Sequence, residues 1–334
     1  MTTVTTVIRR RTPLVASLLA IGLVLGACAS GPSQVNAAAI VGGKTIGVNE
    51  VQDLVTKATQ AEPAVRVLAD QRKLNLLSRA LLRQLVLHEL IADYSVKQQI
   101  TAEPAAVTQL AEQITGSFKE FPADGSASPE AIVQQAVNRT FPADYLARDF
   151  LLLAQFGQAQ MDKLSVTFDF TLVAAAGEQG QTGSLRQQAL DKANQLAKGL
   201  DEAKKVIDAD VAAGAQAAKG ETLTPASAPD IAGTVIFGAP ANSVIAFQPN
   251  PENANWVVAV IHKRAQDGKP TAEAQEDARA ATSLGRRLLQ STGNDLGITI
   301  SPRYGVWDVA DMNIAASESE TLGVVLPIKN TPQQ

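Results

Sequence analysis

A single cysteine carries the only thiol in this chain of 334 residues, and its position suggests a specific chemistry. Cys28 follows an apolar run over residues 14–25, which itself follows a basic cluster at residues 9–11. A positive start, an apolar core of about a dozen residues and a small-residue exit are typical of a secretory signal peptide. The run is too short to cross a bilayer, which needs about 20 residues. We therefore predict that residues 1–27 are a signal peptide.

The four residues Leu25-Gly26-Ala27-Cys28 resemble a bacterial lipobox. The resemblance implies that Cys28 receives a diacylglycerol and becomes the N-terminus after cleavage, which would anchor the protein to the extracytoplasmic face of the cell membrane. Residues 28–36 are small and polar and would form a tether. Acylation would leave no free thiol, so it excludes disulfides and cysteine catalysis. An uncleaved anchor and an ordinary signal peptide are the alternative interpretations.

The chain has only two histidines, His88 and His262, so a histidine-based metal site or triad would have to use both. His88 lies on a stripe of leucines at helical spacing, which predicts a side chain in the core or lining a groove. His262 follows an expected strand and precedes Lys263 and Arg264. This setting favours a solvated strand end over a catalytic role.

Acidic side chains and glycines add no further site. Glu89, Asp93 and Asp149 are predicted to lie on solvated helix faces. Residues 42–44, Gly-Gly-Lys, are too short for a phosphate-binding loop and predict a hairpin turn. We find no paired carboxylates and no metal-ligand spacing, and therefore predict no catalytic residue, no metal and no cofactor.

Composition excludes some classes of function and favours helices. The formal net charge is −4 and no lysine-rich run occurs, so nucleic-acid binding is not expected. Aromatic residues make up only 4% of the chain, while alanine, leucine and valine are abundant. This composition favours helices over an all-β architecture. We predict a mostly α fold with a small α+β insert.

Helical spacing dominates residues 37–164. A short apolar run, a glycine turn and a second short run open this segment, and Asn49 is the expected N-cap of the helix that follows. A broad leucine stripe predicts a long central helix over residues 71–96. Three further helices are expected to begin near Glu103, at Ser128-Pro129 and near Pro142.

The pattern changes at Ser165 and predicts a small α+β unit over residues 165–266. Alternation predicts a strand over residues 166–173, and a helix over 185–200 and a low-complexity stretch over 212–232 follow. Short apolar runs lie at residues 234–237, 243–247 and 256–261. A helix over about 271–290, with small residues at Ala274, Ala278 and Ala281, is expected to return to the first helices. The predicted bundle thus combines residues 37–164 and 269–310, and residues 311–334 form a polar tail.

This order of segments, and the opening run Ala39-Ile40-Val41-Gly42-Gly43-Lys44-Thr45-Ile46, are similar to the SurA/PrsA group of extracytoplasmic chaperones. In that group a strand, a glycine turn and a helix open a helical chaperone module. A parvulin-type prolyl isomerase is inserted, and a C-terminal helix packs back. The resemblance covers about Ala37 to Asp308. It implies a discontinuous helical chaperone bundle interrupted by a parvulin-like domain.

The insert departs from the parvulin pattern where the chemistry would take place. Active parvulins use two facing histidines and a polar Cys or Asp to lower the X–Pro rotation barrier, which is about 20 kcal/mol. Phe170 stands where the resemblance places the first histidine, and Val257, after Trp256, stands where it places the second. Asp169 could mimic the acid but would lack its histidine pair. The resemblance therefore implies a degenerate parvulin-like insert.

The resemblance implies a membrane-anchored chaperone that binds unfolded or partly folded secreted proteins through apolar grooves, without nucleotide and without prolyl isomerase activity. An active parvulin-type isomerase and a scaffolding lipoprotein with one dedicated partner are the alternatives. The segment Arg303–Asp308 concentrates aromatic, cationic and turn residues. It either contacts a partner or pins the C-terminal segment through Tyr304 and Trp307. The sequence does not identify the client-binding residues.

Overall fold

A computed structural model describes residues 36–121, 126–174, 184–249, 254–268 and 277–329. Of these residues, 52% are helical and 20% lie in strands, and the strands form three antiparallel sheets. The prediction of a mostly α fold is therefore wrong, and the described chain is a mixture of helices and sheets. The sequence patterns missed several strands because those strands are short, polar or close to the C-terminus.

A small three-stranded sheet joins the first hairpin of the described chain to a strand that follows helix α9 (Ala278–Leu296). The hairpin β1 (Ala37–Val41) and β2 (Lys44–Gly47) has the order β2-β1-β7 with β7 (Ile298–Ile300). The predicted glycine turn is confirmed, because Gly42 and Gly43 adopt φ values of 56° and 84° that glycine tolerates. Ile300 of β7 pairs with Ala39 of β1, so residues far apart in sequence share one sheet.

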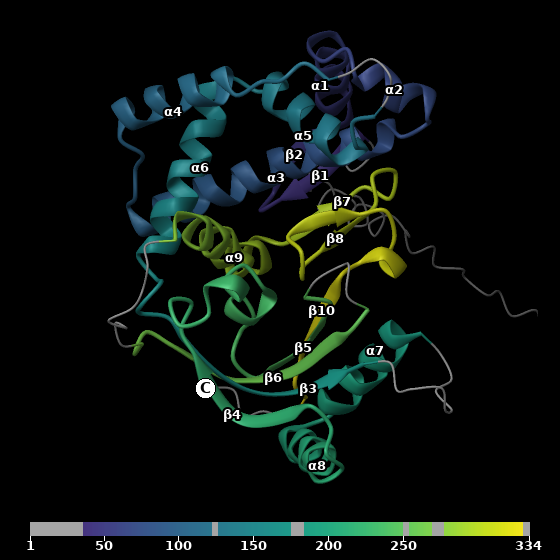
Figure 1. Ribbon diagram of the computed structural model, residues 1–334, viewed down its shortest axis with the longest axis vertical. Coiled ribbons are helices and arrows are strands. Elements are labelled where there is room, and N and C mark those ends of the chain that lie inside the picture. The colour runs from purple at the N-terminus through teal and green to yellow at the C-terminus, as the bar shows by residue number, and fades with distance from the viewer. Residues whose placement is uncertain (1–35, 122–125, 175–183, 250–253, 269–276, 330–334) are drawn as a thin grey trace, which may run out of the picture.

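Six helices follow the hairpin and lie together at one end of the molecule (Figure 1). Asn49 is not the N-cap of the first helix, because Gly47 holds that position. The central helix begins at Leu74 rather than Gln71, after a short helix and a turn. Ser128 caps its helix as predicted, since its Oγ accepts the Ala131 N–H at 3.2 Å. The six helices are α1 (Val48–Ala61), α2 (Val65–Asp70), α3 (Leu74–Gln98), α4 (Pro104–Gly116), α5 (Pro129–Thr140) and α6 (Ala143–Gln158).

A five-stranded sheet occupies the other end of the molecule and has the order β10-β5-β6-β3-β4 (Figure 1). Its strands are β3 (Ser165–Val173), β4 (Ala217–Leu223), β5 (Ser243–Phe247), β6 (Trp256–Ala265) and β10 (Gly323–Pro327). The prediction of a polar tail over residues 311–334 is wrong, because β10 pairs with β5 from Gly323↔Phe247 to Pro327↔Ser243. Residues 323–327 are apolar enough to be a strand, but they are too few to produce a periodic signal.

Helices cover both faces of this sheet. Helices α7 (Leu185–Leu196) and α8 (Leu200–Ala212) pack on one face. The short 3-10 helices η2 (Pro229–Ile231) and η3 (Val235–Phe237) and the long helix α9 (Ala278–Leu296) lie on the other. Helix α8 and strand β4 were missed, because the Ala/Lys/Gly-rich composition over residues 201–223 obscures periodicity. Strand β4 is also a largely exposed edge strand.

Helix α9 begins at the cap Asp277, and the residues expected before it, including Ala274, lie outside the described residues. It returns to the N-terminal helices as predicted and packs on α6. The contact uses Gly157 and Gly285, and the expected Ala281 lies at it as well. A Cβ on Gly157 would overlap the Ala281 carbonyl oxygen, and one on Gly285 would overlap that of Leu153. The two backbones are therefore in direct contact.

The hydrophobic core is continuous from the hairpin to the five-stranded sheet. One cluster of buried side chains contains Val41 of β1, Leu90 of α3, Phe156 of α6, Leu288 of α9 and Ile261 of β6. The helical end and the sheet thus share a core through α9. The remaining short elements are β8 (Val306–Asp308), β9 (Asn313–Ala315) and η4 (Glu318–Glu320).

Candidate functional site: an apolar cavity at the end of helix α9

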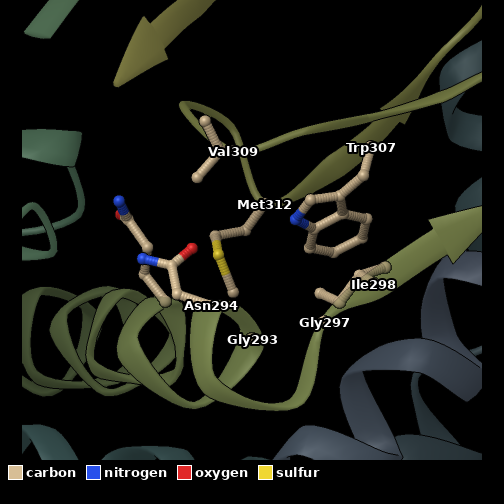
Figure 2. Close-up of a pocket in the computed structure, with 8 residues that line it drawn as sticks. Gly293, Asn294, Gly297, Ile298, Trp307, Val309 and Met312 are labelled. Carbon is tan, nitrogen blue, oxygen red and sulfur yellow. The ribbon is translucent and has the colours of Figure 1, made fainter. Parts of the chain in front are cut away.

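A cavity of about 230 Å³ lies between the last turns of α9 and the strands that follow it (Figure 2). In Figure 2 the side chains of Trp307, Ile298 and Met312 converge above the C-terminal end of the helix. The walls are mostly apolar, and none of the lining residues carries a charge. The lining residues are Gln290, Gly293, Asn294, Gly297, Ile298, Trp307, Val309 and Met312.

The cavity has an open mouth and a buried floor. Asn294 and Gly297 are exposed and mark the mouth, whereas Gln290 and Met312 are each 1% exposed. The Gln290 Oε1 accepts a hydrogen bond from Arg287, but its Nε2 is buried and has no hydrogen-bond partner among the described residues. A buried donor without a partner loses its hydration without compensation, which typically costs about 1–3 kcal/mol. The floor therefore presents an unused donor.

The buried side chain of Arg287 connects the walls of the cavity. Its Nε and Nη2 donate to the Gly233 carbonyl at 3.0 and 2.9 Å. Its Nη1 donates to Gln290 Oε1 and to the Val309 carbonyl, both at 3.1 Å, and Nη2 also donates to the Ala310 carbonyl at 2.8 Å. Burial lowers the pKa of Arg287 to about 10, so the guanidinium keeps its charge at neutral pH. One side chain thus joins α9, the η2–η3 segment and the β8–β9 turn.

The β8–β9 turn, which holds Val309 and Met312 over the cavity, is also fixed from other sides. Asp308 Oδ1 accepts the Ala310 N–H at 2.9 Å, and its Oδ2 accepts the Leu322 N–H at 2.5 Å. Burial raises the pKa of Asp308. The Arg83 Nε of α3 donates to the Met312 carbonyl at 3.0 Å. Met312 itself has φ 53°, an uncommon left-handed conformation that these contacts maintain.

For the segment Arg303–Asp308, which the sequence singled out, the structure bears on the pinning role, whereas the role as a partner contact stays a prediction. Tyr304 and Asp308 are buried at 4% and 3% exposure, so they pin the segment. Trp307 is only partly buried and lines the cavity. The sequence identified Trp307 as a candidate contact but could not show the cavity, which depends on α9 residues that carry no motif.

The two positions compared with parvulin histidines lie together in the sheet. In the ladder between β3 and β6, Phe170 pairs with Ala259 and Val257 pairs with Leu172. Side chains alternate between faces, so Phe170 and Val257 lie diagonally on the same face. Both are partly buried against the core that includes α9. Neither side chain can donate a hydrogen bond or transfer a proton.

Asp169 has a histidine partner, although neither of the two positions compared with parvulin histidines supplies it. His262 Nε2 lies 2.9 Å from Asp169 Oδ2, and Asp169 Oδ1 accepts the Gly220 N–H at 2.7 Å. His262 does not end the strand, because β6 continues to Ala265 and pairs with β3. Asp169 pairs with Val260, which places it and His262 on the sheet face opposite Phe170. The pair therefore lies away from the two parvulin positions.

The expectation of a solvated Asp149 is also wrong. Asp149 is 3% exposed and its Oδ1 lies 2.9 Å from His88 Nδ1, while Gln84 Nε2 donates to its Oδ2 at 3.1 Å. His88 stacks on Tyr145 with ring centroids 4.1 Å apart. Burial raises the pKa of Tyr145. His88 is therefore part of a polar contact between α3 and α6, in agreement with the prediction of a core or groove-lining residue.

The other predicted surface carboxylates form ion pairs. Glu89 pairs with Lys44 at 2.5 Å and Asp93 pairs with Lys97 at 2.8 Å. The described residues contain no group of three or more His, Cys, Asp or Glu side chains arranged to hold a metal ion. Within the same residues, no helix combines the length and apolar character needed to cross a membrane. Cys28 lies outside the described residues.

Comparison with models of known protein families and with curated proteins yields no match for this chain.

Proposed function

We propose that this protein is a lipid-anchored extracytoplasmic chaperone that holds unfolded or partly folded secreted proteins. Cys28 would carry the lipid and keep the folded part at the outer face of the cell membrane. Binding would be weak and would need no nucleotide. The proposed partners are unfolded polypeptides and, through the lipid, the membrane. Nucleic acid is not a proposed partner.

The observation that carries the proposal is the partly open, uncharged cavity at the end of α9. Apolar hollows with polar rims are typical of surfaces that bind exposed apolar segments of other proteins. A second hollow of about 290 Å³ supports the same function, since it contains Val96, which is 77% exposed, and Leu296. The Lys44–Glu89 ion pair lies at this second hollow. Two shallow sites would bind several short apolar segments weakly.

The test is suppression of aggregation by the mature chain with Cys28→Ala, which removes the lipid and keeps the protein in solution. Two unrelated proteins are diluted from denaturant, and light scattering is recorded with and without the chain. We expect scattering to fall in proportion to the chain added, while an inert protein at equal concentration has no effect. Suppression for neither protein would contradict the proposal.

The two alternatives give different results in companion assays. An active prolyl isomerase would accelerate cis–trans exchange of a proline peptide, which we do not expect from Phe170 and Val257. A scaffolding lipoprotein would leave aggregation unchanged and would copurify with one partner. Lipid attachment is tested separately, by mass spectrometry of the mature native protein, which should show a diacylglycerol on Cys28.

A further inference from the structure

The floor of the α9 cavity combines two features that point to one kind of ligand. Its walls are uncharged and mostly apolar, so they offer nothing to balance the charge of an ion or a phosphate. Gln290 Nε2 is a buried donor without a partner among the described residues. A ligand that satisfies both features has an apolar group and a neutral hydrogen-bond acceptor close to it.

The volume limits the apolar group to one side chain. An engineered apolar cavity of about 150 Å³ in another protein binds benzene. The present cavity of about 230 Å³ is therefore large enough for a phenyl or leucyl side chain together with an adjacent carbonyl group. It is too small for a folded element or for two large side chains.

The surroundings of the mouth suit an extended chain. Strand β7 is an edge strand of the three-stranded sheet, and its Ile298 lines the cavity. An edge strand presents backbone groups that can pair with an added strand. A polypeptide passing β7 in extended form would direct alternate side chains toward the cavity. Trp307 and Asn294 offer further side-chain donors at this position.

We propose that this cavity binds a single large apolar side chain of an extended polypeptide, with a neighbouring backbone carbonyl accepting the hydrogen bond from Gln290 Nε2. This inference rests on the proposed holdase function and names the client feature that the protein would recognise. The carbonyl completes the hydrogen bonding of the floor, and the side chain excludes water from Trp307 and Met312.

The fluorescence of Trp307 provides a direct signal of binding in the cavity. The chain has only two tryptophans, and the other, Trp256, is 4% exposed and lies in a different core cluster. In a Trp256→Phe background of the mature chain, emission reports on the cavity. The probe is N-acetylphenylalanine amide, which has one apolar side chain and two backbone carbonyls. We expect a saturable blue shift with an affinity on the order of millimolar, as usual for so small a ligand. N-acetylaspartate amide should produce no shift.

The decisive variant is Gln290→Glu, which keeps an oxygen for Arg287 and replaces the free donor with an acceptor. Loss of one hydrogen bond should weaken probe binding about tenfold. Gln52→Glu, on an exposed position of α1, makes the same charge change and should bind as before. Val309→Phe, which fills the cavity and leaves Gln290 unsubstituted, should abolish the shift and keeps the test valid if Gln290→Glu does not fold.

Equal binding by Gln290→Glu and the parent, or equal shifts with the aspartate probe, would overturn the inference. So would the absence of any Trp307 shift at saturating probe. The outcomes are separable from those of the proposed function. Probe binding without suppression of aggregation rejects the holdase and keeps the site, whereas suppression that is unchanged in Val309→Phe rejects the site and keeps the holdase.

Discussion

Helix α9 packs in opposite ways at its two ends. In its first half, Gly285 meets the Leu153 carbonyl so closely that no Cβ fits between the two backbones. At its C-cap, nothing lies within 4 Å of the position that a Cβ on Gly297 would occupy, and a cavity of about 230 Å³ opens beside it. Glycine thus allows close backbone packing at one end of the helix and borders an open space at the other.

The difference teaches how one helix can serve both stability and binding. Direct backbone contact between α6 and α9 fixes the helix at native packing density, where added volume has nowhere to go. The cavity end is held by hydrogen bonds that Arg287 donates and Asp308 accepts, around a space that the protein itself does not fill. Substitutions that add or remove groups at each end should therefore have unequal effects.

The largest effect is expected for Gly157→Ala. The added methyl group would overlap the Ala281 carbonyl, and neither backbone can move without separating α6 from α9. We expect the free energy of unfolding to fall by more than about 3 kcal/mol, the upper range for overpacking. Urea denaturation measures the change. Gly116→Ala in α4 is the control, because no atom lies within 4 Å of its Cβ position and the substitution should be neutral or stabilising. Similar losses in both variants would contradict the distinction.

Arg287→Lys should have the next largest effect. Lysine keeps the charge but offers three donors at one point, and cannot reach Gly233, Gln290 and Val309 together. We expect a loss of about 3 kcal/mol in unfolding free energy, since buried acceptors lose their partners. Arg279→Lys, at an exposed position of the same helix, is the control and should change stability by less than about 0.5 kcal/mol. Equal denaturation midpoints would show that Arg287 does not hold the walls together.

A smaller effect is expected for Asp308→Asn. The amide can still accept from the Ala310 N–H, but it places a donor against one of the backbone N–H groups, so a loss of about 1–2 kcal/mol is expected. Burial raises the pKa of Asp308 in the folded state, so the folded protein binds the proton more tightly than the unfolded chain. The contribution of Asp308 to the free energy of unfolding is complete below the pKa that its carboxyl has in the unfolded chain. It is lost as pH rises through the higher pKa that the carboxyl has in the folded protein. The stability difference between parent and variant, measured by urea denaturation at each pH, should therefore narrow as pH rises through that window.

The sequence predicted the parts of the fold whose signals are local. The Gly42–Gly43 turn, the Ser128 cap and the strand at residues 166–173 each depend on a few neighbouring residues, and all three are present. Strands β4 and β10 were not predicted, because they are edge strands whose stability comes from pairing with β3 and β5 rather than from their own pattern. Tertiary pairing overrides weak local propensity in such strands.

The candidate site was only partly predictable for a related reason. Trp307 stood out by residue type, but the floor residues Gln290 and Met312 carry no motif. Their roles depend on how the chain after α9 folds back. Arg287 fixes that path by donating hydrogen bonds to the backbone carbonyl groups of Val309 and Ala310, and no pattern of side chains in the sequence reveals such contacts. The pairing of His262 with Asp169 likewise depends on strand register, which the sequence did not fix.

The smallest effect, and the sharpest contrast with Gly157→Ala, is expected for Val309→Ile. Both substitutions add one carbon to a residue near α9. At Val309, however, the new methyl group can enter the cavity, and the Val309 carbonyl that binds Arg287 is unchanged. Burial of one CH₂ is worth at most about 0.8 kcal/mol, so we expect stability to stay equal or rise by up to that amount. Denaturant titration beside Gly157→Ala measures the pair. A loss above about 1 kcal/mol for Val309→Ile would mean that the cavity end is packed as tightly as the α6–α9 contact.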